Sequence, residues 1–154
     1  SIDGLTEAQA SLDRLYTALK DCEIQVDEVE NEFSFQYRAI MDDDFNVPGA
    51  LAVLFDIAKS INLLKNSDQF DQANQLATAL VSLAKPLGVL QQDPGEYLKT
   101  GVQLSKDKID GLISERELAR KNKDFKKSDQ IRDELVSMNI VLEDSADGTS
   151  WRRK

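Results

Sequence analysis

Apolar residues along the first two thirds of the chain recur with the spacing of helices. Four of them fall at intervals of three and four residues and share one helical face: Ala8, Leu12, Leu15 and Leu19. Thr6 is the expected N-cap of this helix, with the acidic Glu7 in its first turn. The repeat could continue through Cys22, Val26, Val29 and Phe33 as one long helix, but we prefer a break in the polar, acidic stretch 20–27.

Three more helices are predicted before residue 90. The second carries Val29, Phe33, Tyr37 and Ile40. The third starts after a cap at Asp44 or Asn46 with Pro48 in its first turn, and its face is Leu51, Leu54, Phe55, Ala58, Ile61 and Leu64. The fourth ends near Gly88 and carries Phe70, Ala73, Leu76, Ala77, Leu80, Leu83 and Ala84. Helices joined by such short polar loops predict an antiparallel bundle over residues 1–92.

The last third changes character. Residues 93–105 are the expected linker, rich in turn residues and with one helical turn at most. Helices are predicted over 106–122 and 124–138, and Asn139 suits a left-handed backbone after the second. Residues 140–142 and 149–151 flank a turn and predict a short hairpin. The expected fold is mainly α: the bundle, then a small α+β domain over 106–154 with two helices and a hairpin.

Charge is distributed unevenly between these parts. The formal net charge is −9, which by itself argues against a nucleic-acid binder. Residues 103–154 hold 12 Lys/Arg against 11 Asp/Glu, whereas residues 1–102 hold 7 against 17. This asymmetry between the two parts of the chain is more informative than the total charge.

Several kinds of chemistry are excluded by composition. The chain has no histidine and one cysteine, Cys22, so it can form neither a Ser/His/Asp triad, nor a thiolate zinc cage, nor an internal disulfide. Asp42 to Asp44 lack calcium-loop spacing, and residues 148–150 lack that of a phosphate loop. A reduced, cytoplasmic setting is expected, since no signal peptide or membrane-spanning apolar run is evident. The start at Ser1 suggests a fragment, and without catalytic motifs we do not expect a complete enzyme.

A basic cluster surrounds the expected junction of the last two helices: Arg116, Arg120, Lys121, Lys123, Lys126, Lys127 and Arg132. Charge alone favours a solvated face with pairs such as Glu117 and Lys121. Phe125 lies inside the basic run, however, and Trp151 precedes two arginines. Either aromatic could belong to the core, but together they offer stacking surfaces beside phosphate-binding charge, which is typical of proteins that bind unpaired nucleotides.

These residues also resemble a known family. KDFKKSDQIRDEL and NIVLEDSADGTSWRR resemble the C-terminal signature of bacterial cysteinyl-tRNA synthetases, while SLDRLY and MDDDFNVPGALAVLFDIAKSIN resemble their helical bundle. The resemblance runs in order along nearly the whole chain. It implies a DALR-type bundle facing the tRNA stem, followed by an anticodon-binding domain. It also implies that the class I catalytic domain lies upstream. ATP, magnesium and zinc are expected there, with no cofactor in this fragment, and the fragment alone is expected to be inactive.

Carried over residue by residue, the resemblance places the tRNA anticodon contacts on Arg120, Phe125, Asp129 and Asp144, with Trp151, Arg152 and Arg153 nearby. Phe125 stands where many members have tryptophan, and Ser128 and Asn139 replace the usual alanine and glycine. The expected partners are the tRNA specific for cysteine, through its anticodon loop and stem, and the upstream catalytic domain, with no membrane. The alternative is a non-enzymatic protein-interaction module whose basic C-terminal arm binds an acidic partner. A third reading is a purely structural bundle.

Overall fold

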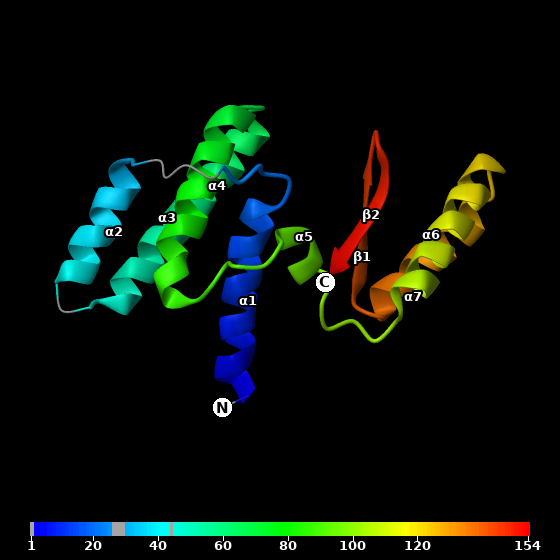
Figure 1. The fold of residues 1–154 in the computed structure, drawn as a ribbon. Helices are drawn as coiled ribbons and strands as arrows, with labels where there is room; N and C mark the ends of the chain where they lie inside the picture. Colours follow the sequence, from blue (N-terminus) through cyan, green and yellow to red (C-terminus); the bar gives the residue numbers. More distant parts are fainter. Residues whose placement is uncertain (1, 26–29, 44) are drawn as a thin grey trace. The chain divides into compact units, whose positions relative to one another are not determined.

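The computed structural model divides into two units, residues 1–97 and residues 98–154 (Figure 1). The first unit is built from helices that run up and down. The structure describes residues 2–25, 30–43 and 45–154. Within those residues the long helices of the first unit are α1 (Ile2–Leu19), α2 (Glu32–Asp42), α3 (Val47–Asn66) and α4 (Phe70–Ala84). The helical bundle expected from the apolar spacing is therefore confirmed.

The central helix of this unit is α3, which packs against α1, α2 and α4. It is also long and apolar enough to cross a membrane by length and composition, with a mean hydropathy of 1.5, where the sequence had indicated no such stretch. One helix of this kind is weak evidence for a membrane. Its apolar character is explained by six residues that it buries in the bundle: Ala50, Val53, Leu54, Ile57, Ala58 and Ile61.

The start of α1 differs from the prediction. The helix begins at Ile2, so Thr6 is not its N-cap; the Thr6 hydroxyl instead donates to the carbonyl of Ile2 at 3.0 Å, one turn back. The preferred break is confirmed, because α1 ends at Leu19 and Asp21 has a left-handed backbone with φ 64°. The next helix begins at Glu32. The expected positions Val26 and Val29 lie outside the described residues.

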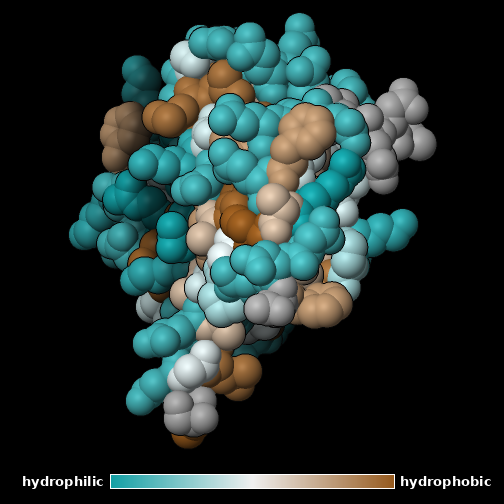
Figure 2. Space-filling view, turned by 90° about the vertical axis from the view of Figure 1, so that its left-hand side faces the viewer, coloured by the Kyte–Doolittle hydropathy of each residue, from teal (hydrophilic) through white to brown (hydrophobic). Residues whose placement is uncertain are grey.

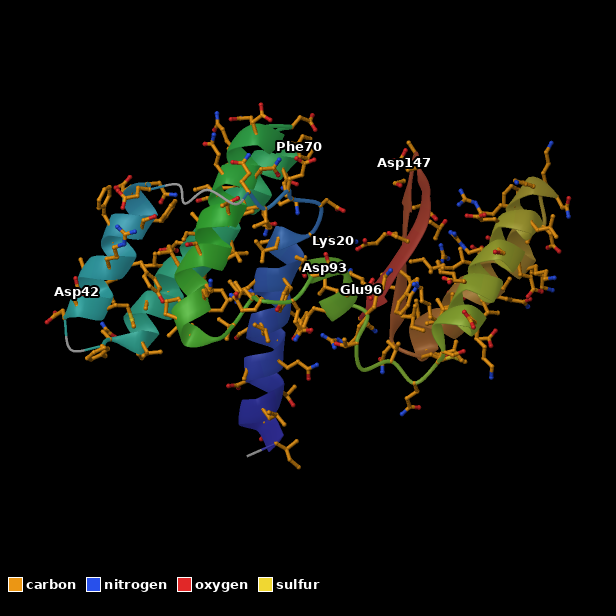
Figure 3. All side chains as sticks on the ribbon, in the orientation of Figure 1. Lys20, Asp42, Phe70, Asp93, Glu96 and Asp147 are labelled. Atoms are coloured by element: carbon orange, nitrogen blue, oxygen red, sulfur yellow. The ribbon has the colours of Figure 1, made fainter. Side chains whose placement is uncertain are left out.

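The remaining ends in the first unit follow capping chemistry. Asn46 is the N-cap of α3 and accepts a hydrogen bond from the Gly49 N–H at 3.0 Å, whereas the other candidate, Asp44, lies outside the described residues. After the short helix η1 (Lys85–Leu87), Gly88 ends the segment in a left-handed conformation, as predicted. Asp93 then accepts from the Glu96 N–H at 2.9 Å at the start of α5, Pro94–Tyr97 (Figure 3).

The face of the molecule that Figure 2 shows is mostly hydrophilic, with hydrophobic side chains emerging between the polar ones. Exposed aromatic rings of the first unit include Phe35, Phe45 and Phe70. The first unit carries 6 Lys/Arg against 17 Asp/Glu and the second carries 13 against 11. The first unit is therefore poor in the positive charge that a polyanion requires.

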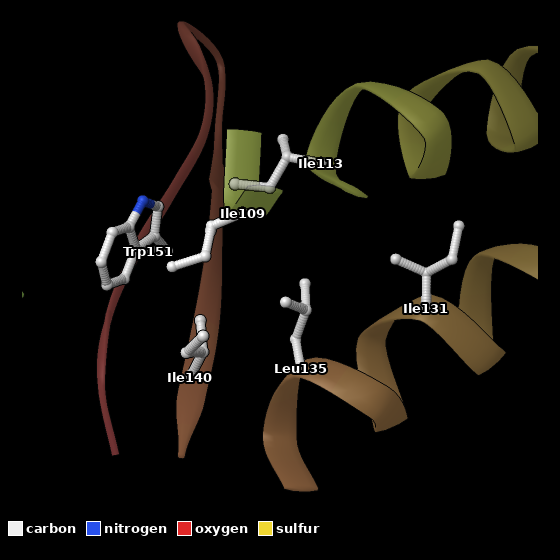
Figure 4. Packing of buried hydrophobic residues seen from close by; sticks show 6 residues of the cluster. All are labelled: Ile109, Ile113, Ile131, Leu135, Ile140 and Trp151. Atoms are coloured by element: carbon white, nitrogen blue, oxygen red, sulfur yellow. The ribbon is translucent and has the colours of Figure 1, made fainter. Parts of the chain in front are cut away.

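The second unit packs two helices against a hairpin. These are α6 (Lys106–Lys121), α7 (Phe125–Ser137), β1 (Ile140–Ser145) and β2 (Gly148–Arg153). The strands are antiparallel, with Leu142 opposite Trp151 and Asp144 opposite Thr149. Asp147 lies at the tip of the hairpin (Figure 3), and Asn139 has the left-handed backbone that was predicted before β1. One cluster drawn from both helices and both strands forms the core (Figure 4): Ile109, Ile113, Ile131, Leu135, Ile140 and Trp151.

The border between the units falls inside the segment expected to be a linker. Tyr97 stacks on Tyr16 of the first unit with ring centroids 3.9 Å apart. The next residue, Leu98, accepts a hydrogen bond from the Arg153 N–H at 2.7 Å in the second unit. Residues on both sides of the border are thus tied into packed structure.

Candidate functional site

The site expected from the sequence centres on the junction of α6 and α7. Helix α6 ends at Lys121, and Lys123 turns the chain with a left-handed backbone at φ 59°. Asp124 then caps α7 by accepting a hydrogen bond from the Lys127 N–H at 3.1 Å. Because the turn is only three residues long, it brings the basic end of α6 next to the basic first turn of α7.

Phe125 is the first residue of α7, and its side chain stands in solvent. It is 61% exposed, although a phenyl ring gains by burial, and exposed Lys123 and Lys126 flank it in the chain. Lys127 is differently placed, because its ammonium pairs with Glu115 at 2.8 Å and that contact raises the pKa of Lys127. The junction therefore offers an aromatic face beside unburied positive charge, which is the combination that holds unpaired bases.

Asp144 lies on β1 and is held by three side chains. Arg116 donates to both of its oxygens, from Nη1 to Oδ1 at 2.9 Å and from Nη2 to Oδ2 at 2.8 Å. Thr149 donates to Oδ1 at 2.7 Å from the opposite strand, and Arg120 reaches Oδ2 at 3.3 Å. The two hydrogen bonds from Arg116, followed by the one from Thr149, hold the pKa of Asp144 well below its usual range. Asp144 is therefore ionised and can only accept hydrogen bonds.

Arg116 is a site residue that was not predicted from the sequence beyond its place in the basic cluster. Its side chain is only 6% exposed, and the pKa of its guanidinium is raised chiefly by the hydrogen bond to Asp144, with smaller contributions from Asp129 and Glu117. The spacing of residues along α6 could have identified Arg116 as a buried cation. Arg116 follows Ile109 and Ile113 on the buried face of α6, and a cation in such a position needs a carboxylate partner.

The second candidate carboxylate, Asp129, is exposed on α7. It pairs with Arg132, one turn further along the same helix, at 3.3 Å. A pair between two such exposed groups is weak and easily exchanged for another partner. Asp129 is thus available to a ligand in a way that Asp144, with its buried partner, is not.

Trp151, Arg152 and Arg153 do not form an exposed arm. Trp151 is 6% exposed in the core of the second unit, with the Lys99 ammonium 5.4 Å from its ring centroid, so no open face is left for a base. Arg152 donates to Glu143 at 2.8 Å across the hairpin. Arg153 donates to the Thr100 carbonyl at 2.8 Å. The sequence left Trp151 either in the core or on the surface as a stacking ring. In the structure Trp151 lies in the core, because residue 151 falls on the inward face of its strand.

A shallow hollow of about 270 Å³ lies beside the Asp144 cluster. One wall comes from α6, through Glu117, Arg120 and Lys121, and the other from the hairpin, through Asp144 and Thr149 among others. Within the described residues, no group of three acidic or cysteine side chains is placed to hold a metal ion. The hollow is bordered by donors and acceptors for hydrogen bonds rather than by a metal-binding cage.

Two known protein families match the chain. Residues 36–91 match the DALR domain, and residues 105–152 match the family described as the cysteinyl-tRNA ligase anticodon binding domain. The second match includes Arg116, Arg120, Phe125, Asp129 and Asp144.

Similar proteins are found among bacteria. The cysteine–tRNA ligases of Pectobacterium carotovorum subsp. carotovorum (strain PC1) and Yersinia pseudotuberculosis serotype O:3 (strain YPIII) are each 48% identical over 158 residues, which cover 100% of this chain and 34% of the ligase. That of Mannheimia succiniciproducens is 47% identical over 154 residues, covering 99% of this chain and 33% of the ligase. The chain spans about a third of the length of these relatives and corresponds to their C-terminal part.

Proposed function

The chain belongs to the cysteine–tRNA ligase family through its DALR and anticodon-binding domains, and from that premise we propose that it binds cysteine tRNA. The second unit would hold the anticodon loop and the helical unit would face the stem. Docking there would let the distant acceptor end reach a catalytic domain that contains the ATP and metal sites. The setting is the bacterial cytoplasm, and no membrane takes part.

The observation that carries this proposal is the exposed ring of Phe125 within the basic junction of α6 and α7. Every base has a π face, so an aromatic ring at this place can stack on any base that leaves the anticodon stack. Lys123 and Lys126 would contact neighbouring phosphates. The ring supplies affinity, and the phosphate contacts fix the register of the loop without reading its sequence.

Base identity would be read by Asp129, Asp144 and Arg120. A carboxylate repels phosphate, so it lowers affinity for RNA in general and is useful only where it accepts N–H groups from a base edge. Arg120 can donate to base acceptors or to phosphate. Trp151, Arg152 and Arg153 would contribute by holding the hairpin in shape, since all three are engaged within the second unit.

The strength of binding should be modest. The second unit has a small excess of positive charge. The first unit has 17 acidic against 6 basic residues, and this excess of negative charge repels the phosphate backbone. We therefore expect affinity for an anticodon stem-loop to depend on its unpaired bases more than on its total charge.

A stem-loop with the cysteine anticodon, competed against a scrambled loop of the same length, tests the proposal. The Phe125→Ala variant should weaken binding of the cognate loop by about 1–3 kcal/mol. Phe70→Ala is the matched control, because Phe70 is also an exposed phenylalanine at the first position of a helix, in the acidic unit. Equal binding of both loops by the unchanged chain, or equal losses in the two variants, would contradict anticodon recognition.

The alternative, a protein-interaction module with a basic arm, predicts a different pattern. It requires no preference for a folded loop over any polyanion and no special effect of Phe125→Ala. The contacts of Arg152 with Glu143 and of Arg153 with Thr100, both within the second unit, disfavour it, because these arginines would have supplied much of the arm's charge.

A further inference from the structure

Four hydrogen bonds occupy the carboxylate of Asp144 in the chain alone. An ionised carboxylate has about four lone-pair positions, two on each oxygen. Oδ1 accepts from Arg116 and Thr149, and Oδ2 accepts from Arg116 and Arg120. A base that is read by Asp144 therefore needs one of these donors to leave first.

The four donors are not equally held. Both Arg116 contacts are short, and that side chain is almost fully buried, while the Thr149 contact is 2.7 Å and lies within the strand pairing. The Arg120 contact is the longest at 3.3 Å, and the Arg120 side chain is 48% exposed. An exposed ion pair is worth little and exchanges readily in water.

Arg120 also lies where a ligand would enter. It lines the hollow beside Asp144, between α6 and the hairpin, and so does the carboxylate itself. Withdrawal of Arg120 toward solvent would open the second position of Oδ2 to that hollow without disturbing the buried contacts.

We propose that Arg120 is an exchangeable occupant of Asp144, replaced by an N–H donor of an unpaired base, while Arg116 and Thr149 hold the carboxylate in place. The inference rests on the proposed function and adds an order of events to it. Arg120 is released at the same moment and becomes free to donate to the RNA. Arg116 is a positioning residue, because it acts on the ligand only through Asp144.

The exchange fixes the sign of the coupling between substitutions of Arg120 and Asp144, and a double-mutant cycle measures that coupling. If the Arg120–Asp144 pair breaks on binding, each single variant loses its RNA contact but is spared the cost of breaking the pair. The double variant loses both RNA contacts but is spared the cost of breaking the pair only once, whereas the two single variants together are spared it twice. Its loss of affinity should therefore exceed the product of the two single losses. A pair that stayed intact in the complex would give a double loss equal to the product, or smaller than it if the two residues act together on the RNA.

The experiment measures binding of the 154-residue chain to the cysteine anticodon stem-loop and to loops with one base changed. The variants are Arg120→Ala, Asp144→Asn and both together. The loss of affinity in the double variant should exceed the product of the two single losses by about two- to five-fold, which corresponds to the strength of an exposed ion pair. Any effect that Asp144→Asn exerts through Arg116 occurs in both arms and cancels. Lys108→Ala, an exposed cation near the start of α6, replaces Arg120→Ala in the control cycle, which should be multiplicative.

A crystal structure of the unchanged chain with the stem-loop gives an independent answer if Asp144→Asn fails to fold. Arg120 should be withdrawn from Asp144, with both Arg116 contacts kept. A multiplicative or smaller double loss, or an intact Arg120–Asp144 contact in the complex, would overturn the exchange alone. Failure of the unchanged chain to distinguish loop sequences would overturn the proposed function and the exchange with it.

Discussion

The buried guanidinium of Arg116 joins helix α6 to the hairpin through the carboxylate of Asp144. Hydrogen bonds that involve charged groups are worth about 1.5–3 kcal/mol, and exposed ion pairs at most about 1 kcal/mol. We expect Arg116→Met to lower the free energy of unfolding of the second unit by about 1–3 kcal/mol. Arg120→Met, which removes a contact to the same carboxylate, should cost less than about 1 kcal/mol. Urea unfolding followed by fluorescence measures both losses of unfolding free energy. Equal losses in the two variants would contradict the expectation that the Arg116 contact stabilises the unit more than the Arg120 contact.

The ionisation of Asp144 makes part of the stability depend on pH. Arg116 and Thr149 lower the pKa of this carboxyl in the folded chain, whereas the unfolded value is about 3.9. Such a group stabilises the fold above the unfolded pKa, and this contribution is lost as the pH falls toward the folded pKa. The difference in unfolding free energy between the unchanged chain and Asp144→Asn should be constant from pH 7 to about 5 and shrink in stronger acid. A difference that keeps its neutral-pH size at pH 2 would contradict the assignment.

Individual residues were predicted well where the backbone conformation follows from local sequence, as for Asn139 at its left-handed turn. The location of Phe125 was left open between core and surface, and the structure places its ring in solvent. Arg116 and Trp151 were not assigned their structural roles, because whether a charged or amphipathic side chain is buried depends on what packs over it. The carboxylate that pairs with Arg116 lies 28 positions away and reaches it only once the hairpin has folded back.

At the scale of elements, the C-terminal end of α1 depends on a group from elsewhere in the chain. The Lys65 ammonium, on α3, donates to the carbonyls of Ala18 at 3.2 Å and Lys20 at 2.8 Å, where α1 runs out of internal donors. Lys65→Met should destabilise the first unit by about 1–2 kcal/mol, since a cation at a helix C-terminus also meets the helix dipole favourably. Lys59→Met, an exposed lysine of the same helix, is the control. Thermal unfolding should separate the two variants.

Existence and order of the helices followed from apolar spacing, whereas their limits required information that spacing does not contain. The N-cap was placed at Thr6, four residues after the start of the helix at Ile2, because threonine favours caps. In the structure its hydroxyl is satisfied inside the helix. The beginning of α7 was predicted to within one residue, since Asp124 both caps the helix and follows a turn.

At the scale of the whole molecule, the two units have separate cores and should unfold as separate cooperative units. Trp151 is the only tryptophan and lies in the core of the second unit, so its fluorescence reports that unit. Leu135→Ala removes a fully buried side chain there and should cost about 2–5 kcal/mol. The fluorescence transition should move to lower urea, while most of the helical circular dichroism, which comes from the first unit, keeps its midpoint.

The reverse variant is the matched control. Leu80 is equally buried in the first unit, and Leu80→Ala should shift the circular dichroism transition while sparing the fluorescence. If both signals moved together in both variants, the two units would unfold as one, and a single free energy would describe the chain.

The pairing of Arg116 with Asp144 also constrains how such a domain can diverge. Loss of Asp144 alone would strand a buried cation, and loss of Arg116 alone would release the carboxylate from its fixed orientation. Relatives are therefore expected to inherit the two residues together or to have replaced both. A lineage that replaced Asp144 would need at least two substitutions, and the intermediate with one of them would be less stable than either end point.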